Sequence, residues 1–459
     1  MKGGRQAALV HGPVGKTLID LTIPMIFGIV GMVAFNLVDT FFVGQLGTRE
    51  LAAMSFTFPV VMVISSVAFG IGIGGSAVIS RAIGEGNQDR VRRLTTDLLA
   101  LALTVVILFV LLGLLTIEPV FRLLGATPDL IPLIREYMTI WYLAMVFLVV
   151  PMVGNNAIRA TGDTRTPSFV MLVAVLVNVV LDPLLIFGIG PFPRLELAGA
   201  ALATVISRAV TFAVAVWVLY FRDRMVTFVW PGVRPILASW RRILYIGLPA
   251  AATNMIVPVS VGVVTRLIAT YGAPAVAAFG VASRIDMFAL TVLMALSTVL
   301  GPFIGQNWGA GRHDRVQAAI RYSEQFSLAW GLLMFLLLGI LARPLAELFN
   351  RDPAVVETVV LYLRVLPISY GFQGILRMCN FSLNVLEKPL YATALTVLQM
   401  FVLYVPLAYL GSALWGLIGI FAAAVAAHVI AGGAAHFVLR QVLAAGARAR
   451  LAQAKAGVA

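Results

Sequence analysis

Two acidic residues lie inside apolar stretches that are long enough to cross a bilayer. Asp39 follows Asn36 by three residues in VAFNLVDTFFV, and Asp182 follows Asn178 by four residues in NVVLDPLLIFG. These spacings place each amide and its acid on one face of a helix. An acid at the centre of a membrane span costs roughly 2.5–3.5 kcal/mol on insertion scales, so each of these acids requires a partner or a function.

The two acids are expected at the same depth, in the outer half of the membrane. Asp39 comes five residues before Gly44, Asp182 comes six residues before Gly188, and Thr204 lies about six residues into the next apolar run. Their oxygen atoms suit Na⁺, and a desolvated pair of acids suits the binding of H⁺.

We therefore predict a cation-coupling site made of four side chains: Asp39, Asn178, Asp182 and Thr204. The same four residues are the expected ligands if the ion is Na⁺. The alternative is that both acids are neutral and only hydrogen-bonded in the protein core.

Composition indicates an all-α polytopic membrane protein. The chain has 459 residues, of which 61% are hydrophobic and only 12% are charged, and its mean hydropathy is +0.98. The single cysteine, Cys379, excludes an intramolecular disulfide. Apolar runs predict twelve transmembrane helices, with approximate limits 18–43, 52–80, 95–117, 133–156, 168–189, 198–221, 243–270, 276–304, 320–342, 356–383, 390–411 and 415–439.

Basic residues in the loops predict the orientation. With the N-terminus inside, 22 of the 33 Lys and Arg residues lie in cytoplasmic segments, six lie in the opposite loops and five lie within spans. This asymmetry predicts an inner (plasma) membrane protein with both termini in the cytoplasm. The net charge of +13 is therefore assigned to topology, and no nucleic acid partner is expected.

The sequence repeats at an offset of 225 residues. Pro24 aligns with Pro249, and GEGNQDRV from Gly84 aligns with GAGRHDRV from Gly309. Each copy holds six spans, an even number, which predicts two six-helix lobes related by a pseudo-twofold axis along the membrane normal. The expected lobes are 1–222 and 243–459, joined by a cytoplasmic linker at 223–242. Val264 and Val405 occupy the positions of Asp39 and Asp182 in the second copy, so the acids belong to the first lobe only.

Several stretches together resemble the multidrug and toxic compound extrusion (MATE) family along essentially the whole chain. They are TIPMIFG from Thr22, NLVDTFFVGQLG from Asn36, GNNAIRATGD from Gly154, NVVLDPLLIFG from Asn178 and the two GxGxxDRV loops. The resemblance implies twelve helices in two lobes and antiport by alternating access, in which organic cations and drugs leave against an inward H⁺ or Na⁺ gradient.

The same resemblance implies roles for individual residues. The family's cation-site positions fall on Asp39, Asn178, Asp182 and Thr204, with Asn155 as a nearby polar contact. Pro24 matches the proline at which the first helix bends. The seventh span has no acid and the tenth has only Glu357 at its edge, which favours the DinF-like branch.

A substrate cleft is expected to include Asn36, Asn155, Phe35 and Asp286, and Arg284 with Asp286 is expected to form an intramembrane ion pair. Some relatives carry a tyrosine where this chain has Phe35. We expect a monomer that is not an enzyme and that needs no cofactor beyond the coupling ion, since none of the four histidines forms an HExxH motif. The alternative function is that of a lipid-linked oligosaccharide flippase of the same superfamily.

Overall fold

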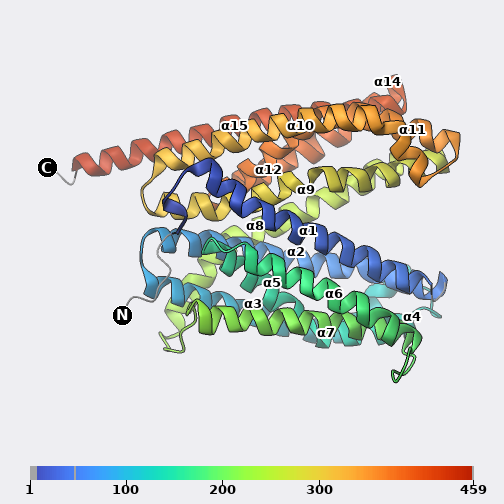
Figure 1. Ribbon diagram of the computed structural model, residues 1–459, viewed down its shortest axis with the longest axis horizontal. Coiled ribbons are helices and arrows are strands. Elements are labelled where there is room, and N and C mark those ends of the chain that lie inside the picture. The colour runs from blue at the N-terminus through green and yellow to red at the C-terminus, as the bar shows by residue number, and fades with distance from the viewer. Residues whose placement is uncertain (1–7, 46–47, 457–459) are drawn as a thin grey trace. The chain divides into compact units, whose positions relative to one another are not determined.

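The computed structural model describes the backbone of residues 8–45 and 48–456, and all side chains there except those of residues 36–41, 43–44, 48–52 and 447–456. Helices account for nearly all of this part of the chain, and it contains no β-strand. Figure 1 shows them as long rods that lie side by side within each half of the chain. The prediction of an all-α membrane protein is confirmed.

The first half of the chain folds into seven α-helices and a short π-helical extension. They are α1 (Val14–Gly44), α2 (Thr48–Gly84), α3 (Gln88–Leu123), α4 (Ile131–Leu143), α5 (Met145–Ala160), α6 (Arg165–Phe187), α7 (Glu196–Trp217) and η2 (Val218–Arg222). A 3₁₀ turn, η1 (Ala8–Val10), precedes them.

The second half repeats this order with more interruptions. Its elements are α8 (Val233–Ala269), α9 (Ala273–Gly309), α10 (His313–Phe349), α11 (Pro353–Val365), η3 (Leu366–Ser369), α12 (Tyr370–Val385), α13 (Pro389–Val397), η4 (Leu398–Tyr404), α14 (Val405–Trp415) and α15 (Leu417–Ala456).

Among the described residues, eleven helical segments are long and apolar enough to cross a membrane, and a bent pair raises the number to twelve. The bent pair is α4 and α5, whose axes differ by 47° across Ala144. The fourth expected span, 133–156, is therefore a broken helix.

The chain divides into two compact units. One unit contains Asp20–Ala251, and the other contains Leu9–Ile19 together with the described residues from Ala252 onward. Helix α8 begins at Val233, inside the range 223–242 that was expected as a linker.

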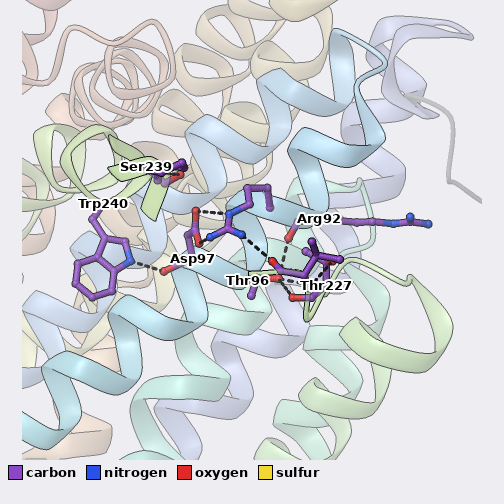
Figure 2. Close-up of polar contacts among 9 residues, drawn as sticks. Arg92, Thr96, Asp97, Thr227, Ser239 and Trp240 are labelled. Atoms are coloured by element: carbon purple, nitrogen blue, oxygen red, sulfur yellow. Dashed lines mark hydrogen bonds and ion pairs between the residues drawn. The ribbon is translucent and has the colours of Figure 1, made fainter. Parts of the chain in front are cut away.

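The segment between α7 and α8 is held against α3 within the first unit. Arg93 binds both carboxylate oxygens of Asp97, at 3.0 and 2.6 Å, and donates a third hydrogen bond to the carbonyl of Val229. The indole of Trp240 donates to the backbone carbonyl of Asp97, and Thr96 accepts from the amide of Thr227 (Figure 2). This part of the expected linker is thus a strap that is bound near the N-terminal end of α3.

Candidate cation site in the first unit

Helix α6 brings Asn178 and Asp182 together. The two residues are one turn apart, both side chains have no exposed surface, and Asn178 Nδ2 donates to Asp182 Oδ1 at 3.1 Å. The oxygen of the same amide, Asn178 Oδ1, is buried and has no hydrogen-bond partner among the described residues. The pair therefore presents a carboxylate and a free amide oxygen inside an apolar bundle.

Helix α7 returns along α6 and brings Thr204 to the same depth. The turn begins at Gly188, whose φ of 71° suits glycine, and the carbonyl of Leu185 accepts from the amide of Leu195 at 3.0 Å. Gly199 then packs directly on the backbone of Leu185. Counted from that contact at 1.5 Å per residue, Asp182 lies about 4.5 Å, Thr204 about 7.5 Å and Asn178 about 10.5 Å along the helices. Thr204 is half-buried.

Helix α1 runs parallel to α6, and the residues that meet are 143 to 145 positions apart in the sequence. Thr164 Oγ1 donates to the carbonyl of Leu21, and Ser168 Oγ contacts Met25 Sδ at 3.7 Å; both pairs are 143 residues apart. Further along, the rings of Phe42 and Phe187 pack edge to face with centroids 6.3 Å apart.

The position of Asp39 follows from this register. Its backbone lies in α1 between the contacts to α6 on either side, and an offset of 143 to 145 residues brings it to within two residues of the level of Asp182. The side chains of Asp39 and Asn36 lie outside the described residues. Their proposed contacts with the ion and the substrate stay predictions.

Phe35 joins the same level from α1. It is buried, and the guanidinium of Arg208 lies 4.7 Å from the centre of its ring, a cation–π contact. Arg208 follows Thr204 by one turn of α7, so α1, α6 and α7 converge here. Sequence reasoning assigned no role to Arg208, although an arginine inside a span four residues after Thr204 was a usable signal.

Asn155 lies on α5, which packs against α2 and α7. Its side chain is buried, and Asn155 Oδ1 has no hydrogen-bond partner among the described residues. Its role beside the coupling site stays a prediction. Pro24 lies within α1, which continues through it as a single helix from Val14 to Gly44.

Asp286 belongs to a different cluster, in the second unit. The hydroxyls of Tyr362 and Tyr370 each donate to its carboxylate, and Phe279 packs edge to face on Tyr362 with centroids 6.0 Å apart. The expected ion pair with Arg284 was wrong: two residues apart on α9, the side chains diverge, and Arg284 is exposed while Asp286 is half-buried.

The oxygens in the first unit fit a small cation. Asp182 supplies a carboxylate, Asn178 Oδ1 is a buried acceptor without a partner among the described residues, and the half-buried Thr204 lies at the same depth on α7. Na⁺ prefers such hard oxygen ligands. A proton needs only the carboxylate, so the arrangement also fits H⁺.

Comparison with known proteins agrees with this architecture. A family model described as MatE matches residues 24–184 and 249–410, and its two matches begin at Pro24 and Pro249, the residues that the internal repeat aligns. The chain is 40% identical over 434 residues to a Shewanella oneidensis protein named FAD transporter, covering 95% of this chain and 96% of that protein. It is 27% identical over 404 residues to the probable multidrug resistance protein YoeA of Bacillus subtilis, covering 86% of each.

Solved structures match as well. The crystal structure of the Vibrio cholerae MATE transporter VcmN in the bent form has a TM-score of 0.90 and 33% identity, covering 94% of this chain and 97% of that one. The family is one of membrane transporters and not of enzymes. The chain therefore belongs to the multidrug and toxic compound extrusion (MATE) family, as its motifs predicted.

Proposed function

We propose that this protein is a cation-coupled antiporter whose coupling site contains Asn178 and Asp182, with Asp39 and Thr204 completing it. The observation that carries the proposal is the fully buried, hydrogen-bonded pair on α6. An ionised acid in such a place is costly, and a bound cation offsets that cost. The protein acts as a monomer in the inner membrane.

The coupling step is an exchange at the Asp182 carboxylate. With a cation bound, the charge is neutralised and the surrounding helices α1, α6 and α7 can close on it; when the cation leaves, the carboxylate favours a hydrated state. A ligand that binds two conformations unequally shifts their populations, and this difference drives alternating access. We favour H⁺ as the coupling ion, with Na⁺ as a substitute, because protonation imposes no strict ligand geometry.

We propose two classes of substrate. The relation to the FAD transporter, at 40% identity over nearly the whole chain, supports export of flavin adenine dinucleotide. The relation to multidrug resistance proteins, at 25–27% identity, supports export of organic cations and drugs, the class that the family motifs implied. We place FAD first on the strength of the closer relation, and organic cations second. The match to the MatE family model favours both over the flippase alternative.

Transport by the purified protein in sodium-free vesicles tests the coupling. A pH gradient alone is expected to drive export of FAD or of ethidium, and Asp182→Asn and Asp39→Asn are each expected to remove this response while the protein remains folded. Asp89→Asn is the matched control, because it makes the same change at a side chain that is 98% exposed. Transport by Asp182→Asn at the wild-type rate, or transport that requires Na⁺ and ignores the pH gradient, would contradict the proposal.

A further inference from the structure

One face of α12 carries four polar side chains inside a predicted membrane span. Gln373, Arg377, Asn380 and Asn384 follow one another at spacings of four, three and four residues, so they form a single stripe. Gln373 Nε2 lies 3.3 Å from His428 Nε2 on α15, and Asn380 Nδ2 donates to Thr396 Oγ1 on α13 at 3.1 Å. Arg377 lies between these two contacts and therefore faces the same neighbours.

Arg377 has no counter-ion in the part of the chain that the structure describes. The residue is half-buried and its Nε is fully buried, and the guanidinium makes neither a hydrogen bond nor an ion pair with any described residue. An arginine offers five N–H donors in a planar fork and stays charged at every physiological pH. Held in a membrane bundle without an acid, such a group is costly, and an anionic ligand would remove the cost.

Free acceptors flank this cation. The Ser369 hydroxyl donates to the carbonyl of Leu366 at 2.8 Å, so at 2.9 Å from His428 Nδ1 it must accept, and the proton lies on Nδ1. His428 Nε2 then accepts from the Gln373 amide, which leaves Gln373 Oε1 free.

Two further amide oxygens of the stripe are also without hydrogen-bond partners among the described residues. Asn380 Oδ1 and Asn384 Oδ1 are both buried without a hydrogen-bond partner among the described residues, and the Asn384 side chain is only 7% exposed. The stripe therefore combines one unpaired guanidinium with three amide oxygens that are ready to accept hydrogen bonds.

We propose that this stripe is a binding site in the second unit for the phosphate groups of an anionic substrate, with Arg377 as the phosphate ligand and the amide oxygens as acceptors for ligand hydroxyl or N–H groups. The inference rests on the proposed transport function and names its substrate class: a phosphorylated organic compound such as a flavin dinucleotide. Arginine binds phosphate oxygens through two parallel N–H bonds, which matches the fork left free here.

The depth of Arg377 favours a soluble phosphate compound over a lipid headgroup. Arg377 lies eight residues before Val385, where α12 ends, which places it about 12 Å along the helix from that end. Lipid phosphates lie at the membrane surface, outside a hydrocarbon core about 30 Å thick.

The internal repeat shows that the fold does not require this arginine. Helices α5 and α12 are both 16 residues long, and their limits, Met145–Ala160 and Tyr370–Val385, differ by the repeat offset at each end. Met152 occupies the position of Arg377 in the first unit. The charge is thus an addition to the second unit.

Equilibrium binding to the purified full-length protein tests the site. We expect FAD to bind, inorganic pyrophosphate to compete with it, and Arg377→Gln to weaken FAD binding about tenfold to a hundredfold, the effect of losing charge-assisted hydrogen bonds. Arg377→Lys keeps the charge but not the fork, so it should retain part of the affinity. Riboflavin, which lacks phosphate, should bind equally to wild type and Arg377→Gln. Arg364→Gln is the matched control at an exposed arginine on α11.

The outcomes separate this site from the coupling site. Wild-type FAD affinity in a folded Arg377→Gln protein, or no binding of FAD or pyrophosphate to the wild type, would overturn the inference. Competition by phosphatidylglycerol but not by pyrophosphate would also overturn it, because the anion would then be a lipid. If FAD binds through Arg377 but no gradient drives its export, the coupling proposal fails and this site stands.

Folding of the variant is checked independently. Removal of a charge that lacks a partner should not lower the melting temperature of the ligand-free protein, and only the wild type should gain stability on addition of pyrophosphate. Equal stabilisation of Arg377→Gln by pyrophosphate would contradict the assignment.

Discussion

At the scale of single residues, the protein uses the same chemical group in opposite ways. Asp182 is fully buried on α6 and accepts a hydrogen bond from Asn178, and its charge state is the variable on which the proposed coupling depends. Asp163 lies outside the spans, in the turn before α6, and has several strong donors. Its carboxylate accepts from the Thr166 amide and hydroxyl and from Arg222 Nη2 at 2.6 Å. Asp182 is suited to exchange a cation, whereas Asp163 stabilises the turn before α6 through Thr166 and Arg222.

Asp163 gives a pH-dependent prediction. Burial disfavours its charge, but the hydrogen bonds from Thr166 and Arg222 outweigh this effect and lower the pKa of the carboxyl below its ordinary value. A lowered folded-state pKa means that its stabilisation is complete above the unfolded value of about 4 and is lost as the pH falls through the folded value.

The melting temperature of Asp163→Asn should therefore be lower than that of the wild type near neutral pH, and it should fall less on acidification below about pH 4. Thermal unfolding in detergent across that range measures both effects. The exposed Asp89→Asn variant should keep the full acid sensitivity of the wild type. Identical acid profiles for Asp163→Asn and wild type would show that this carboxylate does not stabilise the turn.

At the scale of elements, hydropathy predicted most spans because a helix in a membrane must be apolar for about twenty residues. It missed the 47° break between α4 and α5 because no glycine or proline stands at or beside Ala144. The π-helical η4 had a local signal, since Pro406 in the next turn lacks the N–H of a regular helix.

Part of the candidate site could also be predicted from the sequence. The depth of Asp182 and Thr204 could be counted from the ends of the spans, and the amide–acid pair followed from a spacing of four. The tyrosines around Asp286 could not be found in this way, because Tyr362 and Tyr370 lie 76 and 84 residues further along the chain. Such contacts depend on which helices meet, which spacing along one helix does not encode.

The strap between α7 and α8 supplies a prediction at this scale. In Arg93→Met, the Asp97 carboxylate, which is 2% exposed, loses both of its hydrogen bonds from arginine, and we expect a loss of roughly 3–5 kcal/mol in stability. The double variant Arg93→Met/Asp97→Leu should lose less than Arg93→Met alone, because no uncompensated charge remains. A double-mutant cycle of unfolding free energies in detergent measures the difference.

Arg90→Met is the control on the same helix. Its partner Glu85 is partly exposed, so the change should cost at most about 1 kcal/mol. Protease cleavage within residues 223–232 should increase in Arg93→Met and not in Arg90→Met, because only Arg93 holds the Val229 carbonyl. A double variant less stable than Arg93→Met would contradict a role for the unpaired carboxylate.

At the scale of the whole molecule, the repeat specifies the helices but not the chemistry. The family model matches both halves, and α5 and α12 have the same length at equivalent positions. Yet Val405 stands where the first half has Asp182, and Arg377 stands where the first half has Met152. Helix packing constrains the size and apolarity of a side chain, and valine and methionine satisfy both constraints. A polar residue that is present in only one copy of the repeat therefore indicates a function specific to that copy. We infer that the first half exchanges the cation and the second half binds the anionic substrate.

Orientation in the membrane is the property that the charge distribution predicts and that labelling can test. The segments that are predicted to be cytoplasmic carry 22 Lys and Arg residues against six in the opposite loops, so the α7–α8 strap should lie inside and the α6–α7 turn outside. The single cysteine, Cys379, is buried, with 1% of its surface exposed. Cys379→Ser therefore gives a protein without thiols, into which single cysteines can be introduced. In that background, a membrane-impermeant maleimide should label Arg194→Cys in intact cells and Arg234→Cys only after permeabilisation, since both side chains are exposed. The reverse pattern would place both termini outside and would invert the direction in which the proposed gradient drives transport.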